Sequence, residues 1–202
     1  MLLPQGECIW KNLSTSFVDM DELLFFLKRD DFVGYLNLEF PDRQGVVFLQ
    51  EGDLVNGVEQ RKKERRGGKG VVTGILEQSR RESDGWITVS KLTPQTVSVL
   101  ADVLCMSVII LHKGLSSDFS DLEKFVGKLR KEGFHGYIET RLSRGGQEGL
   151  IALDGGKVKA ILTSDMQLVS MRENQAELDF MFSKIIEATK KSEALFDVFV
   201  AV

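Results

Sequence analysis

The chain has 202 residues, 43% of them hydrophobic and 28% charged, which provides apolar material for one large core or two small ones. Its formal net charge of −4 argues against a nucleic-acid partner, and no stretch approaches the roughly 18 unbroken apolar residues of a membrane span. With two cysteines, Cys8 and Cys105, and no signal-peptide pattern at the N-terminus, we expect a reduced cytoplasmic protein.

In chain order, the first half predicts a helix, three strands, a second helix and a closing strand. Apolar residues at i, i+3, i+4 and i+7 place one face of the first helix on residues 20–27. Residues 35–40 alternate as a half-buried strand does, whereas "GVVFLQ" (45–50) is apolar on both faces and therefore predicts a central, doubly covered strand. A third strand, a helix over about 71–76 and the strand "WITVSKL" (86–92) complete the series.

The second half of the chain repeats this pattern. At an offset of 102, residues 8–36 align with residues 110–138, and "FVGY" meets "FHGY". The expected first helix of each half is preceded by a candidate N-cap, Ser16 or Asp118. The short turns "QEGD" and "DGGK" each contain a glycine that can take the positive φ of a tight hairpin. The structural turn glycines that we expect are Gly34, Gly52, Gly136 and Gly156.

These patterns predict an α+β fold that is an internal duplication of an α-β-β-β-α-β unit. The sheets should be mostly antiparallel, with the helices packed on them. We expect the first copy over residues 1–92 and the second over residues 110–202. A connecting helix over residues 93–109 should begin at the Thr93–Pro94 pair, which suits an N-cap and the first helical turn.

The repeated motif resembles the PatA-like N-terminal domain, a domain of unknown function in bacterial response regulators and other signalling proteins. The resemblance lies in a helix patterned L-x-x-L-L-x-x-L, then GxLxL, a turn, and a glycine-punctuated apolar run. The first copy supplies Gly34, Leu36, Leu38, Gly45, Phe48, Gly52, Leu54 and Val55, and the second supplies Gly136, Ile138, Gly149, Gly156, Val158 and Ala160. The resemblance implies two tandem copies of a bacterial regulatory or interaction module without established catalytic residues.

Side chains that could carry catalysis or bind a metal are sparse in the sequence. His112 and His135 have no Cys or second His at ligand spacing, so we expect neither a metal site nor a cofactor. Asp19 and Asp121 recur at equivalent positions and could suggest a carboxylate pair. Each also stands at the start of a predicted helix, where a negative side chain interacts favourably with the helix dipole, and we prefer that interpretation.

One segment, "RKKERRGGKG" (61–70), is unusually basic, with six cations around Glu64 ahead of the second helix. Backbone N–H groups at a helix start with cations nearby form a plausible anion site. The alternative is a solvated, flexible loop held open by like-charge repulsion. The anion-binding candidates are Arg61, Lys62, Lys63, Arg65, Arg66 and Lys69.

The sequence therefore favours a non-enzymatic regulatory or scaffold module that acts through protein–protein contacts in bacterial signalling. The alternative function is a sensor that binds an anionic small molecule or nucleotide at the basic segment 61–70. A third possibility, an enzyme with a dispersed active site, has no motif in its favour.

Overall fold

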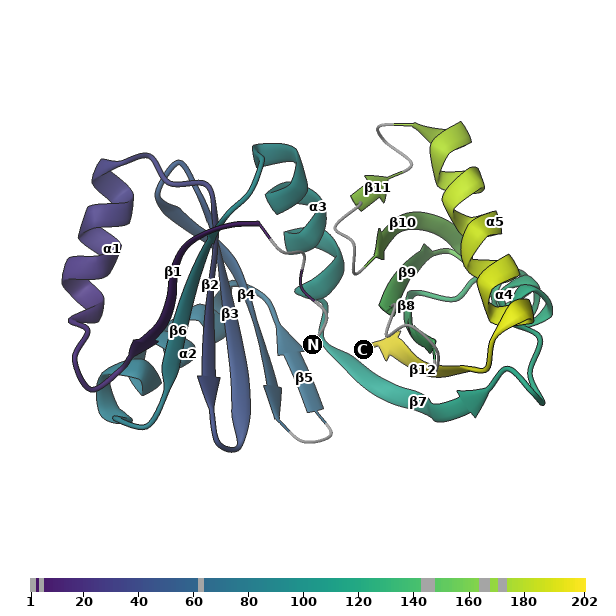
Figure 1. The fold of residues 1–202 in the computed structure, drawn as a ribbon, viewed down its shortest axis with the longest axis horizontal. Helices are drawn as coiled ribbons and strands as arrows, with labels where there is room; N and C mark the ends of the chain where they lie inside the picture. Colours follow the sequence, from purple (N-terminus) through teal and green to yellow (C-terminus); the bar gives the residue numbers. More distant parts are fainter. Residues whose placement is uncertain (1–2, 4–5, 62–63, 143–147, 164–167, 171–173) are drawn as a thin grey trace. The chain divides into compact units, whose positions relative to one another are not determined.

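The protein is α+β, with antiparallel strands and five helices among the residues that the structure describes (Figure 1). The computed structural model describes residues 3, 6–61, 64–142, 148–163, 168–170 and 174–202. Beyond its first four residues the chain divides into two compact units, Gln5–Ser107 (the first unit) and Val108–Val202 (the second unit). No helix in these described ranges is both long enough and apolar enough to cross a membrane.

The first unit is a six-stranded antiparallel sheet with three helices. Its strands lie side by side in the order β1-β6-β2-β3-β4-β5. In chain order the elements are β1 (Glu7–Ser14), α1 (Met20–Arg29), β2 (Gly34–Phe40), β3 (Arg43–Gln50), β4 (Asp53–Arg61), β5 (Glu64–Gly67), α2 (Lys69–Arg81), β6 (Trp86–Lys91) and α3 (Pro94–Leu104). Figure 1 shows α1 on one side of this sheet and α3 on the other.

The second unit contains six described strands and two described helices. The strand order is β7-β12-β8-β9-β10-β11, again with antiparallel neighbours. In chain order the elements are β7 (Val108–Ser116), α4 (Leu122–Lys131), β8 (Gly136–Leu142), β9 (Glu148–Asp154), β10 (Lys157–Thr163), β11 (Leu168–Ser170), α5 (Gln175–Lys191) and β12 (Ala194–Ala201).

The first helix of each unit begins at an aspartate. The Asp19 side chain accepts hydrogen bonds from the backbone N–H groups of Asp21 and Glu22, and Asp121 accepts one from Lys124. The helix-start interpretation of Asp19 and Asp121 is therefore confirmed. The expectation that Ser16 and Asp118 are the N-caps was wrong, because both residues lie in the turn that precedes the capping aspartate.

Each unit buries one face of its sheet under its two flanking helices. In the first unit the predicted apolar face of α1 is buried at Met20, Leu23 and Leu27, and it packs with Val72, Ile75 and Leu76 of α2 on the sheet. In the second unit α4 and α5 cover the sheet in the same manner. Hydrophobic burial is the main favourable term in folding. Burial of these helix faces therefore fixes the helices on the sheet, and the turns that adjoin the helices are positioned with them.

The central strand β3 is buried on both faces, as its sequence predicted, and so is the corresponding strand β9. Val46, Val47, Phe48 and Leu49 are fully buried, and the run 150–153 in β9 is nearly so. In the first unit the second face is covered by α3, which packs on β2, β3 and β4. The Asn56 side-chain amide donates a hydrogen bond to the Ala101 carbonyl, 3.2 Å away.

Two strands in each unit are absent from the predicted α-β-β-β-α-β order. These are the strands before the first helix (β1, β7) and the short strands after the third predicted one (β5, β11). Neither β1 nor β5 has an alternating apolar pattern, and most residues of β1 are exposed. They form because a neighbouring strand offers backbone hydrogen bonds, β6 to β1 and β4 to β5. The prediction missed these strands because they form by pairing with another strand, and hydrophobic periodicity along the chain carries no signal of that pairing.

Candidate functional site

The described residues of the basic segment belong to two paired strands and to the start of a helix, not to a free loop. Arg61 ends β4, Arg65 and Arg66 lie in β5, and Lys69 begins α2. Across the ladder, Gln60 pairs with Arg65 and Glu59 pairs with Arg66. Lys62 and Lys63 lie outside the described residues. The interpretation of the segment as a flexible loop was therefore wrong for its described part, since backbone pairing holds it.

Carboxylates and an amide already engage the arginines of this segment. Arg61 Nη2 lies 3.0 Å from Glu59 Oε1, and Arg66 Nη2 lies 3.0 Å from Glu64 Oε2. The hydrogen bond that Arg61 donates to Glu59 raises the pKa of its guanidinium. The contribution of Glu59 was missed because it precedes the basic run. Glu59 lies two residues before Arg61 on β4, and the alternation of side chains along a strand places both on the same face.

Arg65 differs from its neighbours because it is buried, with 3% of its surface exposed. Its Nη2 donates to the side-chain oxygen of Gln60 at 2.8 Å. A buried side chain is not presented to an incoming anion, so Arg65 is a structural residue. Of the described candidates, Arg61, Arg66 and Lys69 remain exposed.

The turn glycines hold the β3–β4 and β9–β10 turns against the first helices. Gly52 has φ 74° and Gly156 has φ 75°. Each backbone N–H donates to a phenylalanine carbonyl, Phe32 at 2.8 Å and Phe134 at 2.7 Å. Gly34 and Gly136 begin β2 and β8, where a Cβ would lie 2.1 and 2.0 Å from a carbonyl oxygen of the neighbouring strand. The turn assignment is therefore confirmed for Gly52 and Gly156, whereas it was wrong for Gly34 and Gly136, which lie at strand starts where a neighbouring strand leaves no room for a Cβ.

The most exposed aromatic side chains are two phenylalanines in equivalent turns. Phe17 is 91% exposed between β1 and α1, and Phe119 is 93% exposed between β7 and α4. We refer to residues 14–17 and 116–119 as the phenylalanine turns. The Phe17 N–H donates to the Ser14 carbonyl at 3.1 Å, and the Phe119 N–H donates to the Ser116 carbonyl at 3.2 Å.

Each phenylalanine turn is tied to the neighbouring strand region by two hydrogen bonds. Thr15 N–H donates to the Gly85 carbonyl at 3.0 Å, and its hydroxyl accepts from Gly85 N–H at 3.0 Å. Ser117 makes the same two bonds with Ala194, at 2.8 and 2.9 Å. Because the residue two positions earlier is anchored, the phenylalanine ring projects from a held backbone and does not turn back into the core.

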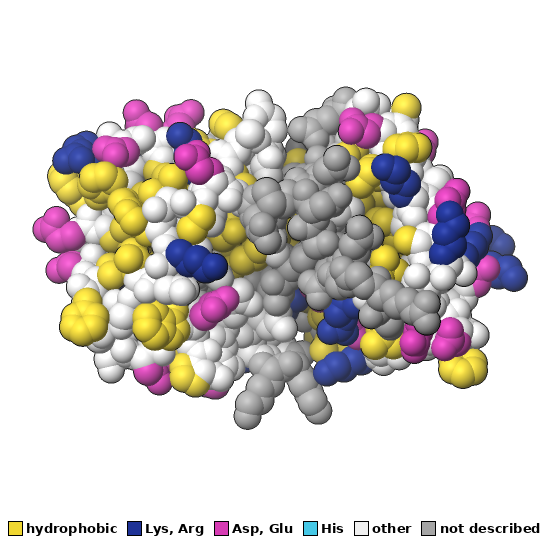
Figure 2. All heavy atoms as spheres, viewed as in Figure 1, with side chains coloured by type: hydrophobic (Ala, Val, Ile, Leu, Met, Phe, Trp, Pro, Cys, Tyr) yellow, Lys and Arg dark blue, Asp and Glu magenta, His cyan; other side chains and the backbone are white. Residues whose placement is uncertain are grey.

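A second apolar side chain lies on the strand beside each turn. Trp86, which pairs with Ser14, is 51% exposed, and Leu195, which pairs with Ser116, is 37% exposed. Figure 2 shows further hydrophobic side chains at the surface of the first unit, over α1 and β1. Phe25 and Ile9 are exposed members of these two elements. Large exposed apolar groups that recur beside one turn indicate a contact surface.

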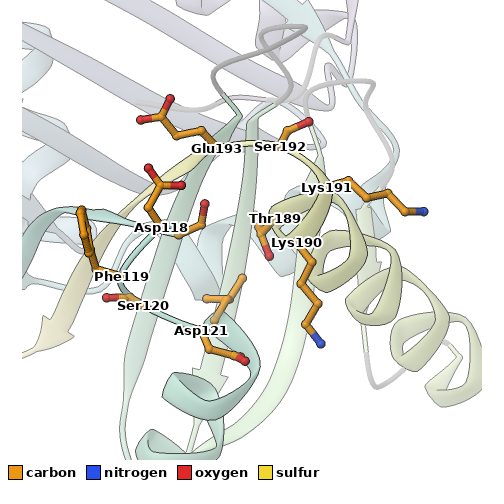
Figure 3. Close-up of a pocket in the computed structure, with 11 residues that line it drawn as sticks. Asp118, Phe119, Ser120, Asp121, Thr189, Lys190, Lys191, Ser192 and Glu193 are labelled. Carbon is orange, nitrogen blue, oxygen red and sulfur yellow. The ribbon is translucent and has the colours of Figure 1, made fainter.

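An open pocket of about 580 Å³ lies next to the second phenylalanine turn (Figure 3). The turn before α4 supplies Asp118 and Phe119, and the end of α5 supplies Lys190 and Lys191. Lys190 Nζ lies 2.7 Å from Glu123 Oε2, and this hydrogen bond raises the pKa of the lysine. Both lysines are exposed and engaged in surface ion pairs, Lys190 with Glu123 and Lys191 with Glu187.

The two histidines make local contacts within the second unit. His135 Nδ1 lies 2.9 Å from Asp154 Oδ1, and the His112 ring makes an edge contact with Phe125. Within the described ranges, no three His, Cys, Asp or Glu side chains are grouped so as to hold a metal ion.

Sequence reasoning did not select the phenylalanine turns. Phe17 and Phe119 align with each other, but both precede the helix N-cap and fall outside the apolar face of the helix that follows. The signal that could have identified these turns is a large aromatic residue that precedes the helix N-cap in both halves of the chain.

No protein-family model matches this chain, and neither a curated protein nor a solved structure does. The resemblance to the PatA-like N-terminal domain therefore stays a prediction.

Proposed function

We propose that this protein is a non-enzymatic regulatory or scaffold module that acts through protein–protein contacts, and that its two units are copies of one structural unit. The pair of phenylalanine turns carries the contact proposal, because each exposes an almost entirely solvated ring from an anchored backbone. The setting that we propose, bacterial cytoplasmic signalling, follows from the PatA-like resemblance.

The element order supports the duplication. Apart from α3, which follows the last strand of the first unit, each unit runs strand, helix, four strands, helix, strand in its described residues, and the sheet orders correspond when β1 is replaced by β7, β6 by β12 and so on. The two sequences align at offsets between 102 and 110, so the correspondence covers sequence and topology together.

Backbone conformations that are rare for ordinary residues also recur in register. Asn12, Asp31 and Glu51 have positive φ in the first unit. Their aligned positions are all glycines with positive φ, namely Gly114, Gly133 and Gly155. Few non-glycine residues adopt this region, so three aligned occurrences support a common backbone plan.

An exposed phenylalanine forgoes the stabilisation that burial would provide. Burying one such side chain contributes about 1.5–3 kcal/mol, so each ring could add that much to the contact that its own unit makes, before the costs of association. Aromatic residues are also enriched among the side chains that dominate binding energy. Phe17 and Phe119 are therefore the two residues that we assign to the contact.

A photo-crosslinking experiment tests this assignment. The photoreactive analogue p-benzoylphenylalanine replaces Phe17, Phe119 or, as the control, Phe180, which is 58% exposed on α5. We expect the same partner to be captured from positions 17 and 119 but not from 180, and the Phe17→Ser/Phe119→Ser variant to release it. Equal capture from all three positions would mean nonspecific hydrophobic adhesion and would refute the assignment.

The alternative function is a sensor of an anionic small molecule or nucleotide at the segment 61–70. Exposed Lys69 at the first position of α2 favours it, since Gly68 offers no capping side chain and the first helical turn has no acidic residue. Thermal shift with nucleotides tests it, because a ligand at about a hundred times its Kd adds roughly 2.7 kcal/mol of stability. No shift in the presence of any nucleotide would leave the contact function as the only proposal.

A further inference from the structure

A second pocket of the second unit contains an unusual pair of cations. It has a volume of about 270 Å³ and lies between the end of α4, the start of β10 and the first half of α5. Its lining residues are Arg130, Lys157, Val158, Gln175, Asp179 and Phe182. Val158 belongs to the apolar core of this unit and Phe182 packs against that core, so the floor of the pocket is apolar.

The β9–β10 turn brings the two cations together. A Cβ on Gly156 would lie 2.4 Å from the Arg130 Cα, which shows that the turn rests directly on the last helical turn of α4. Lys157 follows Gly156 and therefore starts beside Arg130. The contact is between backbones, so the placement does not depend on how either long side chain is oriented.

The first unit shows how far side chains at such positions reach. There Gly52 rests on Lys28 in the same manner, with a Cβ 2.5 Å from the Lys28 Cα. Lys28 Nζ makes an ion pair with Asp53 Oδ1 at 2.5 Å, and Asp53 directly follows that glycine. Side chains at these two positions can thus meet.

The second unit has a cation where the first has this carboxylate. Lys157 follows Gly156 as Asp53 follows Gly52, and Arg130 corresponds to Lys28. Within the described part of the chain, neither Arg130 nor Lys157 makes an ion pair. The carboxylate in the pocket, Asp179, accepts a hydrogen bond from the Gln175 amide at 2.8 Å. Among the described residues that line it, the pocket therefore carries two positive charges against one negative charge.

We propose that this pocket binds a phosphate group. Arg130 can engage two phosphate oxygens with its planar guanidinium, and Lys157 contributes a compact point charge. A phosphate monoester carries about −1.5 to −2 charges at neutral pH and so matches two cations better than a carboxylate does. The volume is just below the usual range of about 300–1,000 Å³ for small-molecule sites, so a single phosphate group with a small substituent fits better than a nucleotide.

The phosphate could come from a small phosphate ester or from a phosphorylated side chain of a partner. Titrating the whole protein with phenyl phosphate and with a phosphoserine peptide, followed by NMR of the backbone amides near residues 130 and 157, separates these sources. Tighter binding of the peptide identifies the protein source, and tighter binding of phenyl phosphate identifies the small molecule. Benzoate serves as the carboxylate comparison.

Lys157→Asp is the decisive variant, because it recreates the acid–base pair of the first unit. Changing the sign of a charge at contact distance should weaken phosphate binding roughly tenfold or more. Lys184→Asp is the matched control, since it changes the net charge of the protein by the same amount. Lys184 is on α5, where its Nζ lies over the Phe180 ring and does not line the pocket. We expect the control to bind as wild type does, and all binding to weaken as salt rises from about 50 to about 300 mM.

Two results would overturn the proposal. One is the absence of amide shifts near residues 130 and 157 at millimolar concentrations of both phosphate probes at low salt. The other is an equal loss of binding in Lys157→Asp and Lys184→Asp, which would mean that net charge alone attracts the anion. Neither cation belongs to a phenylalanine turn, so this proposal and the contact proposal fail independently.

Discussion

Replacing glycines of the second unit by alanine separates two physical costs at neighbouring positions. Gly156 has φ 75°, and an added Cβ would lie 2.4 Å from Arg130 Cα and 2.7 Å from the Arg130 carbonyl oxygen. Gly155 has φ 56° but meets nothing within 4 Å. Gly127, inside α4, also has open space around it and is not among the positive-φ glycines. An alanine at position 156 would therefore suffer both backbone strain and a steric clash. An alanine at position 155 would suffer backbone strain alone, and one at position 127 would suffer neither.

The expected free energies follow from these differences. Gly155→Ala should lower the free energy of unfolding by about 1–2 kcal/mol, the cost of the left-handed region for a residue with a Cβ. Gly156→Ala should cost about 1–3 kcal/mol more, because the atoms that it meets are backbone of α4 and cannot turn aside. Gly127→Ala should raise stability by about 0.5–1 kcal/mol, since alanine is the better helix former.

Urea unfolding followed by far-UV circular dichroism measures these changes. Both tryptophans, Trp10 and Trp86, lie in the first unit, so tryptophan fluorescence gives a separate transition that serves as an internal reference. If Gly156→Ala costs no more than Gly155→Ala, the packing of the β9–β10 turn on α4 is wrong. The placement of Lys157 beside Arg130 would then lose its structural basis.

Three further outcomes are expected. Arg65→Ser should lower the free energy of unfolding by about 1–3 kcal/mol, whereas Arg66→Ser should change it by no more than about 0.5 kcal/mol, as thermal melting would show; equal effects would refute the burial of Arg65. The N–H groups at the start of α4 lower the pKa of Asp121. Its stabilising contribution is therefore present above the unfolded-state pKa of about 4 and is lost as pH falls through the lower folded value, so wild type and Asp121→Asn should converge in stability under acid. Burial raises the pKa of the Cys105 thiol to about 12, so a thiol reagent at pH 8 should titrate Cys8 in the native protein and both cysteines after denaturation; two fast-reacting thiols in the native state would contradict this.

Local periodicity was enough to find the main helices, the central strands and the turn glycines. Hydrophobic spacing reports which side of an element is buried, and a glycine between two strands reports a backbone that other residues rarely adopt. These signals lie within a few residues of each other along the chain. For this reason the buried face of α1, the doubly buried strand β3 and the turn at Gly52 could be predicted.

Tertiary structure decided the features that depend on a distant partner. β1 is a strand because β6 lies beside it, and β5 is a strand because β4 does. Arg65 is buried, although in the sequence it cannot be distinguished from the other cations of the basic run. The exposure of Phe17 likewise follows from the anchoring of its turn at Gly85, almost 70 residues later. The meeting of Arg130 and Lys157 requires a turn to rest on a helix end. Sequence spacing carries no record of such contacts, since the chain brings those residues together only when the sheet and helices pack.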